Sequence, residues 1–167
     1  RYLIDNAARL GFDPTRIVIM GHSAGAHLVA LVGTDESYLR GAGLSFANID
    51  GVIPIDGAAY DVARQMQDGG NFMADTYNQA FGSDPARQRT LSPTLHAASP
   101  NAPAFLIIHV QRKDGTAQSI GLQAALRKGG TKADRQEFEG RGLKGHAEIN
   151  RSLGDPAYAA TPVVDAW

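Results

Sequence analysis

The sequence contains no cysteine, which excludes disulfide bonds, thiol nucleophiles and thiolate metal ligands. It also lacks a long apolar run, since segments such as Phe105–Ile108 fall far short of a bilayer span. Neither sign of charge dominates, because 16 Lys and Arg residues face 17 Asp and Glu residues. Such a balance provides no electrostatic basis for binding nucleic acid or an anionic membrane surface. We therefore expect neither a nucleic-acid partner nor a membrane partner.

What is present suits one compact globular domain. The 167 residues are 43% hydrophobic and 20% charged, which is enough for a sizeable core. No internal repeat, low-complexity tract or domain linker interrupts them. The first residue, Arg1, lies within a helical pattern rather than following an initiator methionine. We therefore expect this chain to be a piece of a longer protein.

Buried strands and amphipathic helices alternate along the chain, and this alternation predicts an α/β fold with a parallel sheet. The strand predicted at 104–110 is apolar throughout, which is typical of a central parallel strand covered on both faces. The polar alternation of 132–139 instead predicts an edge strand. We predict strands at 16–20, 51–55, 104–110 and 132–139, helices at 3–10, 24–33, 116–128 and 147–153, and glycine-containing loops at 34–49 and 140–145.

One stretch, Ile17–Val32, reads IVIMGHSAGAHLVALV and has the pattern G-x-S-x-G between a strand and a helix. In this context the pattern predicts a nucleophile elbow, a tight turn that exposes a serine hydroxyl above the sheet. Gly21 and Gly25 would remove side chains that collide with the backbone of the turn. Ser23 would then be held in a strained conformation.

A serine hydroxyl needs a base to take its proton and a carboxylate to orient that base. In α/β-hydrolases these residues follow the order Ser, Asp or Glu, His. Ser23, Asp114 and His146 occur in this order along the chain, and each follows a predicted strand. Asp56 and Asp61, which follow the preceding strand, are the rival acids. We expect a mobile glycine loop to carry His146 to Ser23.

The remaining histidines are assigned structural roles first. His22 packs against neighbouring strands rather than transferring protons, and His109 is a core histidine with its polar atoms satisfied. His27 and His96 are structural, with His96 as an alternative pocket residue. A metal site is disfavoured because His22 and His27 are five residues apart and no H-E-x-x-H pattern occurs. We expect no metal and no cofactor.

Large apolar residues gather between Asp61 and Asn101, where two short helices at 62–67 and 74–81 are predicted. They either form plain core or belong to a small cap, at 61–101, that builds a substrate pocket above the serine. The apolar residues concerned are Met66, Phe72, Met73, Tyr77 and Phe81. The candidate substrate contacts are His22, Met66, Phe72 and Met73.

These motifs resemble the α/β-hydrolase superfamily, and within it the carboxylesterase branch with kynurenine formamidase-like and feruloyl esterase-like proteins. The supporting strings are GFDPTRIVIMGHSAGAHLVALVGTD, GVIPIDGAAYDV, the AQS that follows Asp114, and GHAEINRSLG. The resemblance implies nucleophile Ser23, base His146, acid Asp114 and an oxyanion donor in the N–H of Ala24. The match departs around Asp114, where Arg112 and Lys113 stand where that family often has an aspartate.

In the resembled family a second oxyanion donor comes from an H-G-G-type loop after an earlier strand, and this sequence contains no such loop. We therefore expect residues 1–167 to be the C-terminal part of a catalytic domain, in preference to a homo-oligomer in which a second chain completes the sheet. The predicted function is hydrolysis of a small-molecule carboxylic ester through an acyl-enzyme. Arylformamidase activity and a non-catalytic binding module are the alternatives.

Overall fold

The computed structural model describes residues 1–68, 73–98 and 100–167. In chain order its elements are α1 (Tyr2–Asp5), α2 (Ala7–Leu10), β1 (Val18–His22), α3 (Ala24–Thr34), α4 (Ser37–Arg40), the 3-10 helix η1 (Phe46–Asn48), β2 (Gly51–Ile55), α5 (Val62–Asp68), α6 (Ala74–Phe81), α7 (Pro85–Thr90), α8 (Pro93–His96), β3 (Ala104–Gln111), α9 (Lys113–Lys128), β4 (Lys132–Arg141), α10 (Gly142–Ser152) and α11 (Thr161–Ala166).

In the described part of the chain, four strands form one parallel sheet in the order β1-β2-β3-β4. Each parallel pair needs a crossover, and the connections after β1 and β3 carry the long helices α3 and α9. The α/β class and the parallel sheet predicted from the sequence are confirmed. All four strands point the same way, so their carboxyl ends meet at one edge of the sheet.

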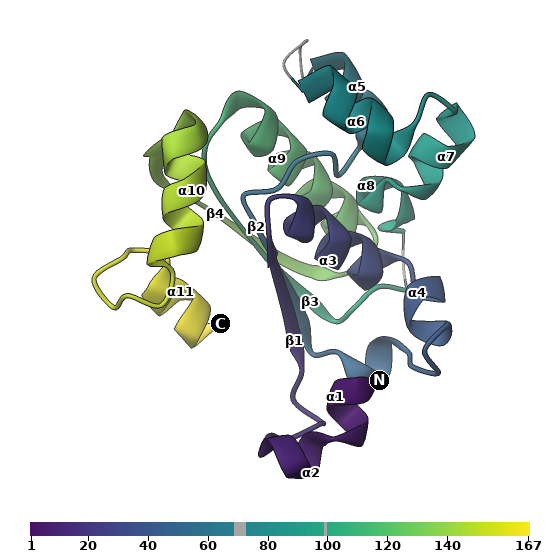
Figure 1. The fold of residues 1–167 in the computed structure, drawn as a ribbon, viewed down its shortest axis with the longest axis vertical. Coiled ribbons are helices and arrows are strands. Elements are labelled where there is room, and N and C mark those ends of the chain that lie inside the picture. Colours follow the sequence, from purple (N-terminus) through teal and green to yellow (C-terminus); the bar gives the residue numbers. More distant parts are fainter. Residues whose placement is uncertain (69–72, 99) are drawn as a thin grey trace.

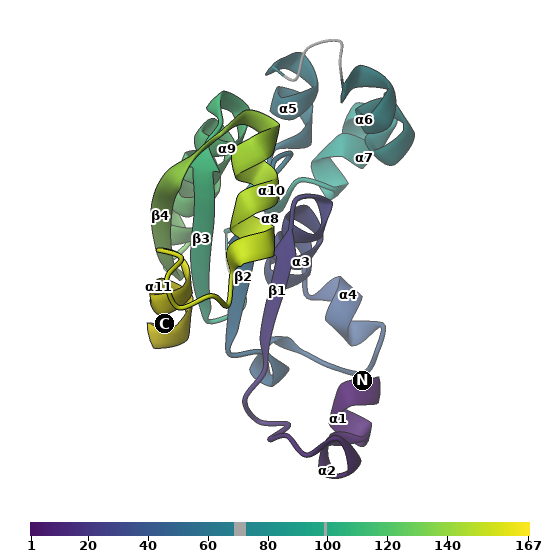
Figure 2. The same cartoon turned by 60° about the vertical axis from the view of Figure 1, so that its left-hand side comes forward.

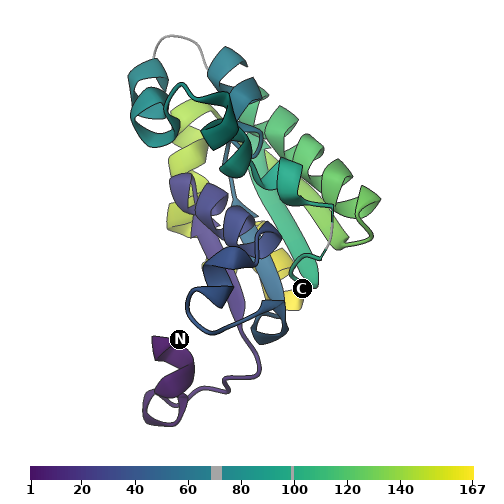
Figure 3. The same cartoon turned by 90° about the vertical axis from the view of Figure 1, so that its right-hand side faces the viewer.

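Helices cover both faces of the sheet (Figures 1 and 3), and an apolar core lies under the helices of each face. The side chains of β2 and β3 alternate between them, because successive residues of a strand point to opposite faces. On one face, Val52, Phe105 and Ile107 pack beneath α3 and α9, where Ala30 and Leu122 are fully buried. On the other face, α10 and α11 cover a second set, Ile53, Ile55, Leu106, Ile108 and Val110. Figure 2 shows α10 lying across this second face.

The outer strands differ in how they meet solvent. On β1, Val18 and Met20 are 48% and 51% exposed, so this strand has apolar side chains on an uncovered surface. The other outer strand, β4, is polar, and its predicted place at the edge is confirmed. Its register against β3 shifts between Val110 and Gln111, where the chain leaves β3 for α9.

Two predicted loops are helical instead. The 34–49 loop contains α4 and η1, and η1 begins with a capping box in which Ser45 and Asn48 bond each other's backbone. The expectation of a flexible loop at 140–145 is wrong, because α10 begins at Gly142 and includes His146. Glycine there serves close packing: a Cβ on Gly145 would lie 2.5 Å from the carbonyl carbon of Gly140.

Helices α5, α6 and α7 lie beyond the carboxyl edge of the sheet in every view, above the turn between β1 and α3 (Figures 1 and 2). Proline at the first turn starts α7, α8 and α11, where its missing N–H costs nothing. Among the residues that the structure describes, no helix combines the length and apolarity needed to cross a membrane.

Candidate active site

Ser23 lies in a tight turn between β1 and α3, as the elbow pattern predicts. Its backbone has φ 58° and ψ −118°, a conformation that a non-glycine residue rarely adopts. The turn is fixed by a hydrogen bond in which Ser23 N donates to the carbonyl of Ile55 at 3.0 Å. The strain therefore sits on the residue whose hydroxyl is presented at the sheet edge.

The two glycines of the elbow are not equivalent. A Cβ on Gly21 would lie 2.3 Å from the carbonyl oxygen of Gly25, so a side chain there cannot fit without moving backbone. A Cβ on Gly25 would meet no other part of the described structure within 4 Å. The sequence predicts that both positions need glycine to avoid a steric clash, but the structure shows such a clash for a side chain at Gly21 and not at Gly25.

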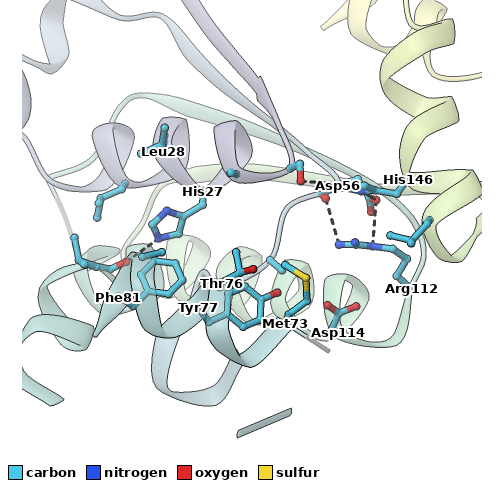
Figure 4. A pocket seen from close by; sticks show the side chains of 18 of the residues that line it. His27, Leu28, Asp56, Met73, Thr76, Tyr77, Phe81, Arg112, Asp114 and His146 are labelled. Carbon is cyan, nitrogen blue, oxygen red and sulfur yellow. Dashed lines mark hydrogen bonds and ion pairs between the residues drawn. The ribbon is translucent and has the colours of Figure 1, made fainter. Parts of the chain in front are cut away.

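Three polar side chains meet beside the elbow in a chain of hydrogen bonds (Figure 4). The imidazole Nε2 of His146 lies 2.9 Å from Ser23 Oγ, and its Nδ1 lies 2.5 Å from Asp56 Oδ2. A carboxylate accepts hydrogen bonds, so Nδ1 carries the proton and Nε2 is left free to accept one. The arrangement can therefore remove a proton from the serine hydroxyl.

Asp56 follows the last residue of β2 and is fully buried. It adopts φ 45°, a left-handed conformation that aspartate tolerates better than most residues. Its backbone N donates to the carbonyl of Ile108, and its Oδ1 accepts from Val110 N at 3.2 Å. Both bonds come from β3, so the neighbouring strand holds this carboxylate in place.

Asp114, the acid predicted from the sequence, is not within reach of His146 in this structure. It lies in the first turn of α9, and its Oδ2 accepts a hydrogen bond from Gln65 Nε2 at 3.2 Å. The physical reason is strand order: β2 lies next to β1, whereas Asp114 follows β3, one strand farther from the elbow. The rival acid Asp56 occupies the position beside the imidazole, and Asp61 caps the start of α5 instead.

His22 contacts His146 directly, which the sequence did not indicate. Its Nε2 donates to the carbonyl oxygen of His146 at 2.8 Å, and the two ring centres are 4.4 Å apart. Burial lowers the pKa of His22, and the neighbouring His146 lowers it further. His22 is therefore a neutral donor that fixes the backbone of His146. His146 is held by α10, not by the mobile loop expected from the sequence.

A cavity of about 890 Å³ opens at the serine (Figure 4). Its walls come from α3, from the segment after β2, from α6 and α7, and from the start of α9 and α10. The apolar residues along it include Leu28, Leu31, Met73, Tyr77, Phe81 and Leu91. The site is thus a mostly apolar pocket with the serine, its histidine and a few charged groups at one side.

The predicted substrate contacts fall in different places. Met73 lines the cavity, while Met66 packs with Val62 and Phe81 in a small apolar cluster instead. His22 contacts His146 and is not among the lining residues. Phe72 lies outside the described residues. Leu28 of α3 also lines the cavity. Its place there could not be predicted from the sequence, because it lies on the exposed side of the helix.

The other histidines are structural, with one addition. His109 is fully buried; its Nδ1 donates to the carbonyl of Val110, and Arg135 Nη1 donates to its Nε2 at 2.7 Å. His27 donates to the carbonyl of Leu91, yet it also lines the cavity, where burial lowers its pKa. His96 bonds the carbonyl of Thr90 and is not among the lining residues. Within the described ranges, no three histidine or acidic residues are grouped as metal ligands.

A family model named BD-FAE matches residues 1–126, which include the elbow, Asp56 and the start of α9. The chain belongs to the BD-FAE family. A search of curated proteins finds no match. The predicted α/β-hydrolase resemblance is confirmed at the level of the superfamily by this match and by the solved structures that share the fold.

Among solved structures, this BD-FAE chain is similar to esterase B from Lactobacillus rhamnosis, with 19% identity and a TM-score of 0.73, over 99% of this chain and 55% of that one. A truncated carbohydrate esterase from gut microbiota is 24% identical, with a TM-score of 0.69 over 87% of this chain and 59% of that one. An arylesterase is 19% identical, with a TM-score of 0.62 over 83% and 47%. The chain therefore spans about half the length of these three structures, and at these identities the likeness concerns the fold.

Proposed function

We propose that this chain carries the catalytic centre of a serine hydrolase that cleaves carboxylic esters. The observation that carries the proposal is the continuous hydrogen-bond chain from Ser23 Oγ through His146 to the buried Asp56 carboxylate. Membership of the BD-FAE family and the fold likeness to three esterases support the same reaction class.

In the proposed mechanism, His146 Nε2 takes the proton of Ser23 Oγ as the oxygen attacks the ester carbonyl carbon. Ala24, the first residue of α3, has no carbonyl one turn earlier to bond, so its N–H is available to the developing oxyanion. The tetrahedral intermediate then expels the alcohol, which takes the proton from His146, and leaves an acyl-serine. Water, deprotonated by the same imidazole, releases the acid and restores the serine.

Asp56 is the proposed acid of this triad in place of Asp114. It holds the Nδ1–H tautomer of His146 and stabilises the imidazolium that forms during attack. The apolar cavity beside the serine is the proposed site for the acyl or alcohol part of a small-molecule ester, with α6 and α7 as part of its wall. Residues 61–101 would in that role act as the small cap that the sequence offers as the alternative to plain core.

Turnover of a p-nitrophenyl ester by Ser23→Ala tests the nucleophile. We expect the variant to lose the release of p-nitrophenol that the parent chain shows, and retained turnover would remove Ser23 from the mechanism. Labelling of the parent chain by a fluorophosphonate, with no labelling of the variant, would separate the enzyme from a non-catalytic binding module. Comparison of N-formylkynurenine with phenyl esters as substrates separates arylformamidase from esterase activity.

A further inference from the structure

Arg112 contacts the same carboxylate as the proposed catalytic histidine, and the triad does not account for it. Its Nε lies 3.2 Å from Asp56 Oδ2, the oxygen that also receives His146 Nδ1. Its Nη2 donates to the backbone carbonyl of Asp56 at 3.3 Å. Figure 4 shows Arg112 and His146 meeting at Asp56, with Asp114 apart from them.

The local structure is built to admit this guanidinium. The Arg112 side chain is only 15% exposed and precedes the first residue of α9. A Cβ on Gly115, one turn into that helix, would lie 3.0 Å from Arg112 Nη2, so glycine leaves the room that the guanidinium occupies. Arg112 Nε lies at ion-pair distance from Asp56 Oδ2 but not in the geometry of a hydrogen bond. The guanidinium therefore acts on Asp56 Oδ2 through its charge.

The titratable side chains that face Asp56 from the surrounding elements are neutral near pH 7. They are His22 from β1, Tyr60 after β2, His109 from β3 and Tyr158 after α10. Burial lowers the pKa of the two histidines and raises the pKa of the two tyrosines. None of these four therefore offsets the carboxylate charge.

The other charged groups nearby are in contact with solvent. Lys113 and Asp114 line the cavity from the start of α9, the first exposed and the second half-buried. On α10, Lys144 is exposed and Glu148 is half-buried, with Arg151 and Ser152 as its partners. Water screens such charges, so the sheltered guanidinium of Arg112 has the greater effect on Asp56.

We propose that Arg112 is a positioning residue that limits how strongly Asp56 stabilises the protonated form of His146. This inference rests on the proposed function, because it concerns the base of that triad. A carboxylate alone beside an imidazole favours the imidazolium, which cannot accept the serine proton. Arg112 opposes this by placing a fixed positive charge at the same oxygen, so the base stays unprotonated to lower pH.

The expected size of the effect follows from the shared oxygen. Because Arg112 Nε and His146 Nδ1 both contact Asp56 Oδ2, the two nitrogens are at most about 6 Å apart. A unit charge about 6 Å away, at an effective dielectric constant between roughly 20 and 80, shifts a titration by roughly 0.5 to 2 pH units. Removal of Arg112 should therefore move the acid limb of the kcat/KM profile upward by that amount.

The variants are Arg112→Gln and Arg112→Lys, with Lys128→Met as the control. Glutamine keeps an amide donor for the Asp56 carbonyl and removes the charge, whereas lysine keeps the charge and loses the two-point contact. Lys128 is exposed in the last turn of the same helix, so its variant makes the same change of net charge far from the site. We expect the acid limb of the kcat/KM profile to move to higher pH in R112Q and to stay in place in R112K and K128M. The kcat of R112K should be reduced.

A second measurement keeps this inference separate from the proposed catalysis. In a Ser23→Ala background, NMR of the His146 ring should show its titration midpoint raised by R112Q by roughly 0.5 to 2 pH units, whether or not the parent chain hydrolyses esters. An unchanged midpoint in R112Q, or equal shifts in R112Q and R112K, would overturn the role of the charge. Absence of ester turnover by the parent chain, with the NMR shift present, would instead overturn the proposed function.

Discussion

Replacement of Asp56 by asparagine is the sharpest test of which carboxylate serves His146. The carboxylate accepts from His146 Nδ1 with one oxygen and from Val110 N with the other. An asparagine side chain has one acceptor oxygen and one NH2 group, so it cannot accept on both sides. In one orientation the NH2 group faces Val110 N–H, which places two donors in contact. In the other orientation the NH2 group donates to His146 Nδ1, so the proton of the imidazole must move to Nε2.

In the second case Nε2 can no longer accept the proton of Ser23. A wrong tautomer of this kind costs about 10⁴-fold in kcat in serine proteases, and we expect a loss of the same order for Asp56→Asn. Asp114→Asn should change kcat by less than about threefold, because an asparagine oxygen still accepts the hydrogen bond from Gln65 that Asp114 receives. The comparison of the two variants therefore identifies the acid.

The assay is kcat and KM for p-nitrophenyl butyrate, with far-UV circular dichroism to show that each variant is folded. Asp56→Asn also leaves Arg112 without its carboxylate, and breaking a buried ion pair costs about 3–5 kcal/mol of unfolding free energy. Rates should therefore be measured well below the melting temperature of that variant. Loss of activity in Asp114→Asn, together with wild-type activity in Asp56→Asn, would refute the assignment drawn from the geometry.

Three further predictions concern other parts of the site and core. Gly21→Ala should lower Tm by about 5 °C or more, since the added methyl meets the Gly25 carbonyl and such overpacking costs about 2 kcal/mol, whereas Gly25→Ala should leave Tm unchanged or higher in the same thermal scan. His22→Leu should lower kcat about fivefold with little change in KM, because a hydrogen bond worth about 1 kcal/mol no longer fixes the backbone of His146, the proposed base; an equal-fold rise in KM would contradict this. Burial lowers the pKa of His27 and His109 in the folded chain, whereas both histidines in the unfolded chain keep the ordinary pKa of about 6.5. Below that pH the unfolded chain binds more protons than the folded chain, so Tm should fall as the pH drops through and below about 6.5. A His27→Gln variant should show a smaller change of Tm with pH.

The sequence was sufficient for the features that depend on local pattern. The strand at 51–55 and the elbow serine follow from short-range periodicity and turn chemistry, and the structure places both as predicted. The helix predicted at 147–153 is present as α10, but its first turn with His146 was missed because Gly140, Gly142 and Gly145 are typical of a loop. The structure shows instead that Gly145 lies against Gly140, which is a contact between the end of β4 and the first turn of α10. Glycine frequency alone does not distinguish mobility from close packing.

The choice of acid depended on information that chain order does not contain. Asp56 and Asp114 both follow strands of one parallel sheet, so both lie near its carboxyl edge. What separates them is which strand is adjacent to β1, and adjacency is a property of the assembled sheet. Because β2 pairs with β1 over five consecutive positions, from Val18–Gly51 to His22–Ile55, the residue after Ile55 comes next to the elbow. The pairing of β1 with β2 therefore places the Asp56 carboxylate beside the elbow serine and its histidine.

The same strand order explains why an arginine follows β3. With the carboxylate placed after β2, the segment that leaves β3 passes directly beside it, and Val110 N and the Arg112 side chain both bond Asp56. A second carboxylate at position 112 would lie against a buried anion, and two buried like charges cannot both stay ionised at low cost. A cation there is compatible with Asp56 as the ionised partner of His146. The arginine after β3 and the carboxylate after β2 are thus two parts of one arrangement of charge.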